Sequence, residues 1–235
     1  MSKQIIDDFD GRTKLLLGEK FDKIKEFKFV ICGVGGVGSI IPLTLVRTGV
    51  KNITIIDFDK VDASNLNRQI AYDKNDIGLL KVDALENKIN LLRDDVKVNK
   101  IEKQIDNNFD FSIFDDADYV FDCIDDIPAK ISLIKYCYEH KIKIISSLGM
   151  GNRLNPSKII ISTLDKTYGD PLAKKIRTLL KKENVDISKI VVSFSYEKPI
   201  IKDRIISSIA FVPNESGLLM TSFVLCELLE IKEEQ

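Results

Sequence analysis

The sequence has few cysteines, no long apolar run and almost no net charge. Its four cysteines are widely spaced and form no Cys-x-x-Cys pair, so the sequence predicts neither a zinc site nor a disulfide framework. No apolar run approaches the roughly 18 residues of a membrane-spanning helix. The first residues lack the basic and then apolar pattern of a signal peptide. We therefore expect a cytoplasmic protein with no membrane partner.

The charge balance excludes one further class. Lys and Arg number 35 and Asp and Glu 36, which gives a net charge of −1. This balance rules out a globally basic nucleic-acid binder but permits a local basic patch. With 235 residues, of which 44% are hydrophobic, the chain can form one large α/β domain or a domain with an appended lobe.

A glycine-rich turn organises the first half of the chain. The apolar residues 29–32 predict a buried parallel strand, residues 39–48 a helix, and residues 53–56 a second buried strand that ends at Asp57. Between the first strand and the helix lie four glycines that let phosphate oxygens approach the backbone: Gly33, Gly35, Gly36 and Gly38. An acidic residue about 20 positions later completes a nucleotide-binding pattern, with Asp57 placed to accept hydrogen bonds from a ribose. The alternative is a tight turn without a ligand.

The residues after Asp57 argue against NAD as the nucleotide. Residues 57–69 form a loop rich in amides, which also contains an arginine. Such a loop suits the charge neutralisation of a triphosphate better than hydride transfer.

Strands and helices alternate as far as residue 147. A helix is expected over residues 79–92 and strands over 96–101, 118–122 and 142–147. This alternation predicts an α/β fold with a doubly wound, mostly parallel Rossmann-like sheet. We expect a helical lead-in at 1–27, anchored by Leu15, Leu16, Leu17, Phe21 and Ile24. A nucleotide-binding Rossmann-like region follows at 28–150, and a substrate-binding part of the same domain at 151–235.

This last part is predicted to be a strand and helix extension. Strands are expected at 158–162, 191–195 and 204–208, and a C-terminal helix from residue 213 to 229. The helix at 172–182 has five cations and no acid: Lys174, Lys175, Arg177, Lys181 and Lys182. It is either a solvated face or a surface that follows RNA phosphates.

Four charged residues lie where strands end or helices begin: Asp57, Arg68, Lys81 and Asp125. In open parallel sheets, ligands bind outside the carboxyl ends of the strands. Arg68 and Lys81 suit phosphates, and Asp125 suits Mg²⁺. The alternatives are a solvated lysine and an Asp125 that only caps the next helix.

These motifs resemble those of the ubiquitin-activating-type adenylating enzymes, which use ATP and Mg²⁺ to convert a carboxylate into an acyl-adenylate. The resemblance rests on the glycine pattern, Asp57-Phe-Asp59, Ser64-Asn-Leu-Asn-Arg-Gln69, Lys81 and Asp122-Cys-Ile-Asp125. It implies ATP contacts from the glycines and from Asp57, Asp59, Asn65, Asn67, Arg68, Gln69, Lys81, Asp125 and Asp126. It also implies a metal at Asp125 and a catalytic role for Arg68, Lys81, Asp125 and Arg12. Arg12 would be contributed across a homodimer; the alternative is a solvated surface arginine. Asp126 stands where many members carry Asn.

The later motifs 146–156, 165–177 and 211–220 are similar to those of the tRNA threonylcarbamoyladenosine dehydratases. That branch implies activation of a threonyl carboxylate on a modified adenosine beside the anticodon, followed by cyclisation and loss of AMP. A cysteine-desulfurase-type sulfur-transfer system is a further partner to consider. Two alternatives remain: adenylation of the C-terminus of a ubiquitin-like sulfur carrier, and nucleotide sensing without catalysis.

The carrier-activating branch commonly has zinc-binding Cys-x-x-Cys pairs and a late catalytic cysteine, which are missing here. We expect no catalytic cysteine: Cys32, Cys137 and Cys226 are predicted to lie in apolar surroundings. Asp125 and Asp126 are expected to raise the pKa of Cys123.

Overall fold

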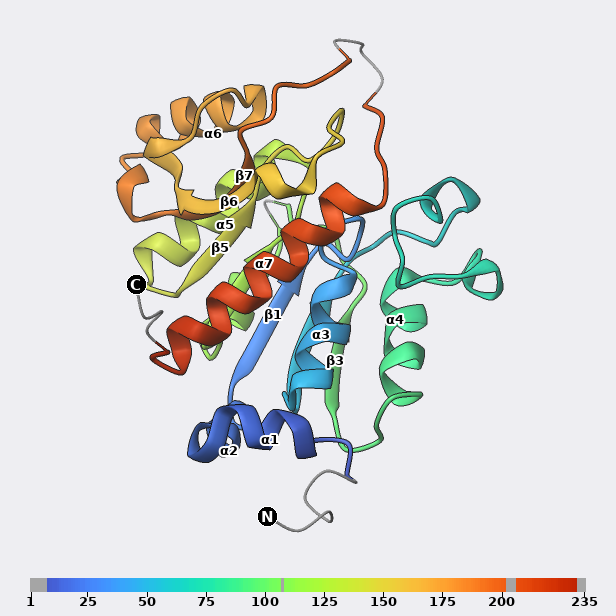
Figure 1. Cartoon of the computed structure of the whole chain (residues 1–235). Coiled ribbons are helices and arrows are strands. Elements are labelled where there is room, and N and C mark those ends of the chain that lie inside the picture. The colour runs from blue at the N-terminus through green and yellow to red at the C-terminus, as the bar shows by residue number, and fades with distance from the viewer. Residues whose placement is uncertain (1–7, 107, 202–205, 232–235) are drawn as a thin grey trace.

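Seven strands form one twisted sheet in the computed structural model, which describes residues 8–106, 108–201 and 206–231 (Figure 1). The strand order is β3-β2-β1-β4-β5-β7-β6. All neighbours pair in parallel except β6, which runs antiparallel to β7. The strands span β1 Lys28–Cys32, β2 Asn52–Ile56, β3 Lys97–Ile101, β4 Tyr119–Asp122, β5 Ile144–Ser147, β6 Ile159–Thr163 and β7 Val191–Ser195.

Helices cover both faces of the sheet. They span α1 Gly11–Leu17, α2 Phe21–Ile24, α3 Ile40–Thr48, α4 Lys81–Asn90, α5 Ile127–Glu139, α6 Pro171–Lys182 and α7 Phe211–Leu228. Helices α3, α4 and α7 pack on one face, and α5 and α6 on the other (Figure 1). The predicted doubly wound, mostly parallel α/β fold is confirmed.

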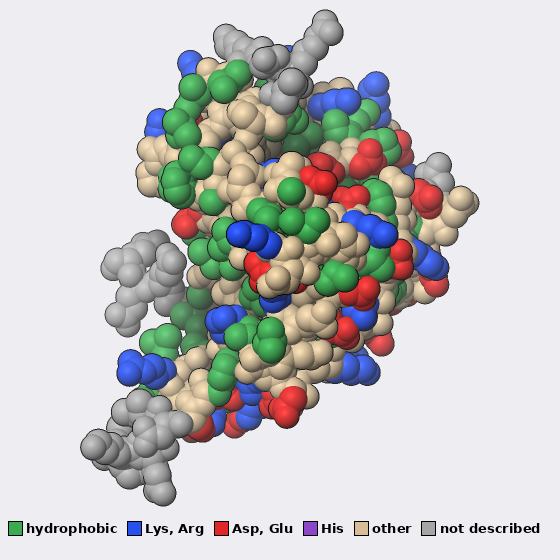
Figure 2. All heavy atoms as spheres, turned by 90° about the vertical axis from the view of Figure 1, so that its right-hand side faces the viewer, with side chains coloured by type: hydrophobic (Ala, Val, Ile, Leu, Met, Phe, Trp, Pro, Cys, Tyr) green, Lys and Arg blue, Asp and Glu red, His purple; other side chains and the backbone are tan. Residues whose placement is uncertain are grey.

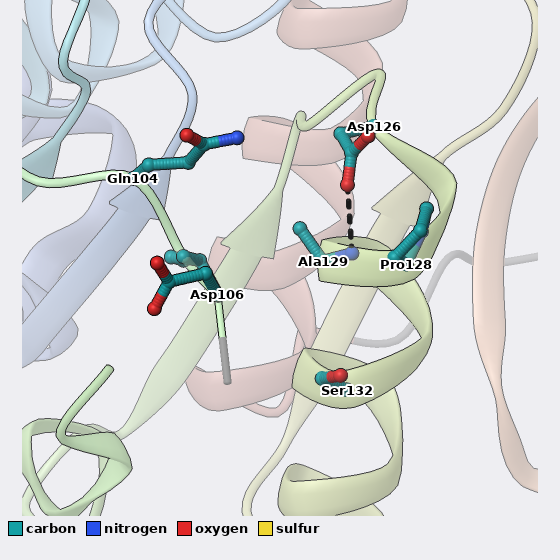
Figure 3. A pocket seen from close by; sticks show the side chains of 7 residues that line it. Gln104, Asp106, Asp126, Pro128, Ala129 and Ser132 are labelled. Carbon is teal, nitrogen blue, oxygen red and sulfur yellow. Dashed lines mark hydrogen bonds between the residues drawn. The ribbon is translucent and has the colours of Figure 1, made fainter. Parts of the chain in front are cut away.

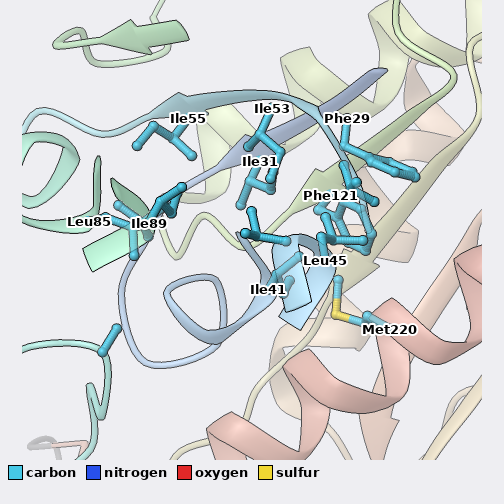
Figure 4. Packing of buried hydrophobic residues seen from close by; sticks show 14 of the residues in the cluster. Phe29, Ile31, Ile41, Leu45, Ile53, Ile55, Leu85, Ile89, Phe121 and Met220 are labelled. Carbon is cyan, nitrogen blue, oxygen red and sulfur yellow. The ribbon is translucent and has the colours of Figure 1, made fainter. Parts of the chain in front are cut away.

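Alternate residues of each strand supply the two cores. Phe29 and Ile31 of β1 pack with α3, α4 and α7 (Figure 4), whereas Val30 and Cys32 pack with α5 and α6. A strand that is buried on both faces needs a continuous apolar run, as the β1 sequence has. The edge strand β3 is only half-buried at Val98 and Ile101 and exposes its lysines and its asparagine.

The C-terminal part of the chain extends the sheet that the first part begins. Strand β7 pairs with β5, β6 pairs with β7, and α7 packs along α3. The expected boundary near residue 150 therefore falls after β5, inside one continuous sheet. Among the described residues, no helix is both long enough and apolar enough to cross a membrane.

The N-terminal helices lie at the amino edge of the sheet. Phe21 and Ile24 are buried as expected, but Leu16 is 84% exposed and Leu15 is also exposed, so these two do not anchor the segment. The Phe21 ring fills the space beside Gly49, where a Cβ atom would lie 2.7 Å from it. Gly49 ends α3 at a φ of 115°, which favours glycine.

The predicted strand at 204–208 is wrong for residues 206–208, which form no strand; residues 204 and 205 lie outside the described residues. Ser207 instead forms hydrogen bonds with Asn152, which lies in the turn after β5. The Asn152 N–H donates to the Ser207 carbonyl oxygen at 2.8 Å, and the Ser207 N–H donates to Asn152 Oδ1 at 2.8 Å. Asn152 thus satisfies the backbone groups of Ser207 without a strand ladder.

Candidate nucleotide-binding site

Backbone conformation and close packing require glycine at two positions of the turn. Gly33 has a φ of 81°, and a Cβ atom there would lie 2.9 Å from the Cys123 carbonyl oxygen. A Cβ atom at Gly38 would lie 1.9 Å from the Gly33 carbonyl oxygen. At Gly35, in contrast, the nearest atom would be Gln69 Nε2 at 3.8 Å, which is ordinary contact. Packing therefore leaves space beside Gly35, at the position where a phosphate would approach the backbone.

Asp57 joins the end of β2 to this turn. Its Oδ2 accepts the Val34 N–H at 2.8 Å and its Oδ1 accepts the Asp59 N–H at 2.8 Å. Burial raises the pKa of Asp57, and the charge of Lys81 opposes that rise. Each carboxylate oxygen retains a second lone pair for a ribose hydroxyl.

Lys81, the first residue of α4, is nearly buried. Its Nζ lies 2.7 Å from Asp59 Oδ2, and its own N–H donates to the Asp59 carbonyl oxygen at 2.9 Å. The two residues thus hold the loop that connects β2 to α4 closed at its base. A triphosphate would have to compete with Asp59 for the Lys81 ammonium.

The amide-rich loop is internally bonded. The Arg68 guanidinium donates from Nη1 to the Ser64 carbonyl oxygen and to Asn67 Oδ1, both at 2.9 Å. Asn67 Nδ2 donates to the Ser208 carbonyl oxygen at 3.1 Å, and Asn65 accepts the Asp62 N–H at 3.2 Å. The loop is therefore preformed, and Arg68 is partly exposed at its surface.

Two buried polar atoms beside the turn lack a partner among the described residues. They are Gln69 Oε1 and Ser39 Oγ, in side chains that are nearly or fully buried. Buried polar atoms are normally hydrogen-bonded. Ser39 Oγ, at the start of α3, can donate to an anionic ligand that the helix N-terminus would also attract, whereas Gln69 Oε1 can only accept and suits a ligand hydroxyl or amino group.

The loop after β4 holds the two predicted aspartates. Asp126 caps α5 by accepting the Ala129 N–H at 3.0 Å, so the cap is Asp126 and not Asp125. Asp125 is exposed, and its side chain accepts no hydrogen bond from the described residues. One carboxylate together with phosphate oxygens is a usual Mg²⁺ site, so this donor set fits the ion. No group of three His, Cys, Asp or Glu that could hold a metal occurs in the described ranges.

Sequence reasoning missed the pairing of two charges beneath this loop. Lys130 of α5 donates from Nζ to Asp122 Oδ2 at 2.7 Å, to Ser146 Oγ at 3.0 Å and to the Ser147 carbonyl oxygen at 3.0 Å. Both charged side chains are fully buried. In the sequence, Asp122 and Lys130 each stand as a charged residue within an apolar segment. This pattern does not indicate that the two side chains form an ion pair.

A cavity that the sequence did not predict adjoins Asp126. It measures about 140 Å³, and Figure 3 shows Gln104 and Asp106 facing the start of α5 across it. Its lining combines the segment after β3 with the first turns of α5: Gln104, Ile105, Asp106, Asp126, Pro128, Ala129 and Ser132. The cavity beside Asp126 is therefore lined by both polar and apolar side chains.

Arg12 does not join these residues within one chain. It is exposed on α1, which precedes β1 and lies at the amino edge of the sheet, opposite the glycine turn (Figure 1). An Arg12 that reaches this site would therefore have to come from a second copy.

The basic helix α6 is exposed at four of its five cations, Lys174, Lys175, Lys181 and Lys182. Arg177 differs: its Nη1 donates to the Thr167 carbonyl oxygen at 2.7 Å and contacts Thr167 Oγ1, so it supports the preceding loop. On the face that includes α4, cations and acids are instead interspersed (Figure 2). There Lys88, for example, pairs with Asp73 and Asp76.

Three of the four cysteines, Cys32, Cys123 and Cys137, have a raised pKa and are therefore poor nucleophiles. Burial and then the charge of Asp122 raise the pKa of Cys123, so the expected cause, Asp125 and Asp126, is wrong. Burial also raises the pKa of Cys32, and it raises the pKa of Cys137 to about 12. Cys226 is partly exposed on α7 rather than buried.

The mostly parallel sheet, with the glycine turn at its carboxyl edge, is the fold of a nucleotide-binding class of protein. The ThiF family model matches residues 11–220, and the chain belongs to that family. The predicted adenylating-enzyme resemblance is thus confirmed at the level of the family.

Individual proteins also match this chain over most of its length. The tRNA threonylcarbamoyladenosine dehydratase of Bacillus subtilis is 34% identical over 94% of both chains. That of Escherichia coli is 35% identical over 74% of this chain and 65% of its own.

Solved structures agree with these sequence matches. The E. coli tRNA N6-threonylcarbamoyladenosine dehydratase TcdA in complex with ATP has a TM-score of 0.89 and 28% identity. The match covers 97% of this chain and 96% of that one. E. coli MccB, with a TM-score of 0.68 and 21% identity, shares the fold.

Proposed function

We propose that this chain is an ATP-dependent tRNA threonylcarbamoyladenosine dehydratase. The observation that carries the proposal is the match over 94% of both chains to a relative of that name, joined to a site with phosphate-binding features. Space beside Gly35, the carboxylate of Asp57 and the cations Arg68 and Lys81 gather at one edge of the sheet.

The proposed reaction has two steps. An oxygen of the threonyl carboxylate attacks the α-phosphorus of ATP, the bond to the bridging oxygen breaks, and pyrophosphate leaves. A nitrogen or oxygen of the same threonylcarbamoyl group then attacks the activated carbonyl carbon, AMP leaves and a proton is released. The net change in the nucleoside is the loss of one water. A nucleophile already on the substrate has a high effective concentration, so no enzyme cysteine is required.

Each residue has a proposed role. Asp57 accepts hydrogen bonds from the ribose, and Asn67, Arg68 and Lys81 bind phosphates, with Lys81 leaving Asp59 to do so. Such cations stabilise the charge that develops on the transferring phosphoryl group. Asp59, Asn65, Gln69 and Asp126 complete the nucleotide contacts.

Asp125 is the proposed Mg²⁺ ligand. When bound, the ion would neutralise phosphate charge and polarise the leaving pyrophosphate. The Asp125 carboxylate is exposed just after β4 and is therefore accessible to such an ion.

The chain is proposed to act as a homodimer in which Arg12 of each copy serves the partner's site. The distance between α1 and the glycine turn within one chain supports this arrangement, since Arg12 is then useful only to a neighbour (Figure 1). The exposed α6 lysines are proposed to bind the tRNA backbone. A sulfur-transfer partner stays a prediction.

The test is nucleoside mass spectrometry. Threonylcarbamoyladenosine-containing tRNA is incubated with the protein and ATP-Mg²⁺, and the nucleoside is expected to lose one water, with AMP and pyrophosphate formed in equal amounts. Reactions without ATP, or with a Lys81→Met variant, serve as controls. ATP-dependent adenylation of a ubiquitin-like carrier, with tRNA unchanged, would favour the alternative substrate instead.

A further inference from the structure

Two tyrosines form an exposed aromatic surface next to α6. Tyr168 and Tyr196 are 57% and 38% exposed as residues, and their ring centroids lie 6.4 Å apart with 31° between the planes. The Tyr168 ring also meets the buried Phe194 ring edge-on, with centroids 5.6 Å apart. The pair is thus supported from below by the core and faces outward.

This surface lies at the same edge of the sheet as the nucleotide site. Tyr196 follows the last residue of β7, and β7 runs parallel to β5 and β1, so Tyr196 lies beyond a carboxyl end. Two strands, β4 and β5, separate β7 from β1 in the sheet. At about 4.8 Å per strand, the tyrosines lie on the order of 15 Å along the edge from the glycine turn.

Hydrogen bonds fix the tyrosine surface to both neighbours. The Asp170 carboxylate caps α6 through the Leu172 N–H at 2.8 Å and also accepts the Gly149 N–H at 3.0 Å, just beyond β5. Arg177 of α6 holds the carbonyl oxygen of Thr167, the residue before Tyr168. The loop that carries Tyr168, the start of α6 and the end of β5 are therefore joined by hydrogen bonds.

Of the carboxylates that lie near the tyrosines in the chain, Asp165 is exposed, whereas two others are engaged by backbone N–H groups. Asp170 is buried and engaged by backbone N–H groups. Glu197 accepts the N–H groups of Leu154 and Asn155 at 3.1 and 2.9 Å. The exposed charge on α6 itself is positive, because the helix holds no acid.

We propose that Tyr168 and Tyr196 stack against unpaired bases of the RNA that flank the modified nucleoside. The inference rests on the proposed tRNA substrate and deepens it. A base whose attached carboxylate must enter an active site has to leave its stack, so its neighbours need a new surface. Exposed aromatic rings beside cations are the usual surface for single-stranded nucleic acid, with the rings taking bases and the cations taking phosphates.

The test compares binding of two RNAs to Tyr168→Ala and Tyr196→Ala variants. One RNA is the tRNA hairpin that carries the modified nucleoside, and the other is a fully paired duplex of equal length. Each alanine variant is expected to lose about tenfold in hairpin affinity, which is about 1.4 kcal/mol, and to bind the duplex as the parent does. The KM for ATP should not change.

Two controls separate stacking from folding. Tyr168→Phe and Tyr196→Phe retain the rings and are expected to bind the hairpin like the parent protein. Leu91→Ala removes an exposed apolar side chain from the end of α4 and should change nothing. An equal loss for hairpin and duplex, or a loss that the Phe variants share, would overturn the stacking role.

The outcome also distinguishes this inference from the proposed function. If the parent protein dehydrates the tRNA nucleoside but both alanine variants keep full hairpin affinity, the tyrosine surface is refuted and the function stands. If the parent neither binds the hairpin nor changes the nucleoside, the function itself fails. Selective capture of a peptide by the tyrosines, with no effect on RNA, would also refute the proposal.

Discussion

Replacing Lys130 with methionine tests the importance of the buried charge pair under the loop that carries Asp125. In the parent protein, Lys130 and Asp122 have no exposed side-chain surface, and the ammonium makes three hydrogen bonds of 2.7–3.0 Å. The substitution leaves the Asp122 carboxylate buried without its cation. Removing one partner of such a pair typically costs about 3–5 kcal/mol. That is a large share of the roughly 5–15 kcal/mol by which a domain is stable.

Urea denaturation is the assay, and the Lys130→Met midpoint should fall while the slope stays unchanged. Lys135→Met is the matched control: its partner Glu183 lies 2.8 Å away, but both side chains are well exposed, so about 0–1 kcal/mol is expected. An Asp122→Asn/Lys130→Met double variant should lose less stability than the sum of the two single variants. A Lys130→Met loss no larger than that of the control would refute the reasoning.

Two further predictions concern the site and the RNA surface. Asp125→Ala should abolish ATP-dependent turnover but change the free energy of unfolding by less than about 0.5 kcal/mol, because the residue is exposed. Normal turnover in that variant would contradict the metal role. Charge reversal of Lys174 and Lys181 should weaken tRNA binding and lower its salt dependence by about one unit of slope for each phosphate that is no longer neutralised, with the KM for ATP unchanged. Lys23→Glu, on α2 at the opposite edge, is the control, and an equal effect there would mean that α6 is only a solvated face.

Much of the fold follows from local sequence because each strand carries its own signal. The apolar runs of β1 and β4 could only be buried on both faces, and the glycine turn fixed where β1 gives way to α3. Carboxyl ends of parallel strands share one edge, which is why Asp57 and Asp125 could be assigned to one site from the sequence.

Interactions between distant segments could not be predicted in this way. Nothing near Arg177 indicates that it holds Thr167 rather than solvent, and an apolar run at 15–17 does not reveal which leucine faces outward. Within 206–208, the β-branched Ile206 favours extended backbone, which is typical of a strand. The partner of this segment proved to be the side chain and backbone of Asn152, which sequence patterns do not show.

The thiols offer a last prediction, on mechanism. A covalent thioester route needs a thiolate at the nucleotide site, and only Cys32 and Cys123 end or follow a strand there. Cys32 is fully buried, and burial raises the pKa of both thiols, with Asp122 adding to the effect at Cys123. Their thiolate population near neutral pH is therefore very small.

Cys226 does not supply the missing nucleophile. It lies in the last turns of α7, beside Leu17 and Ile24 from the N-terminal helices at the amino edge of the sheet. A variant with all four cysteines changed to alanine should thus retain ATP-dependent loss of water from the tRNA nucleoside. Folding is checked by its urea midpoint and nucleotide binding by calorimetry. A trapped thioester in the parent protein, or an inactive variant that still folds and binds ATP, would show that the ring does not close directly on the adenylate.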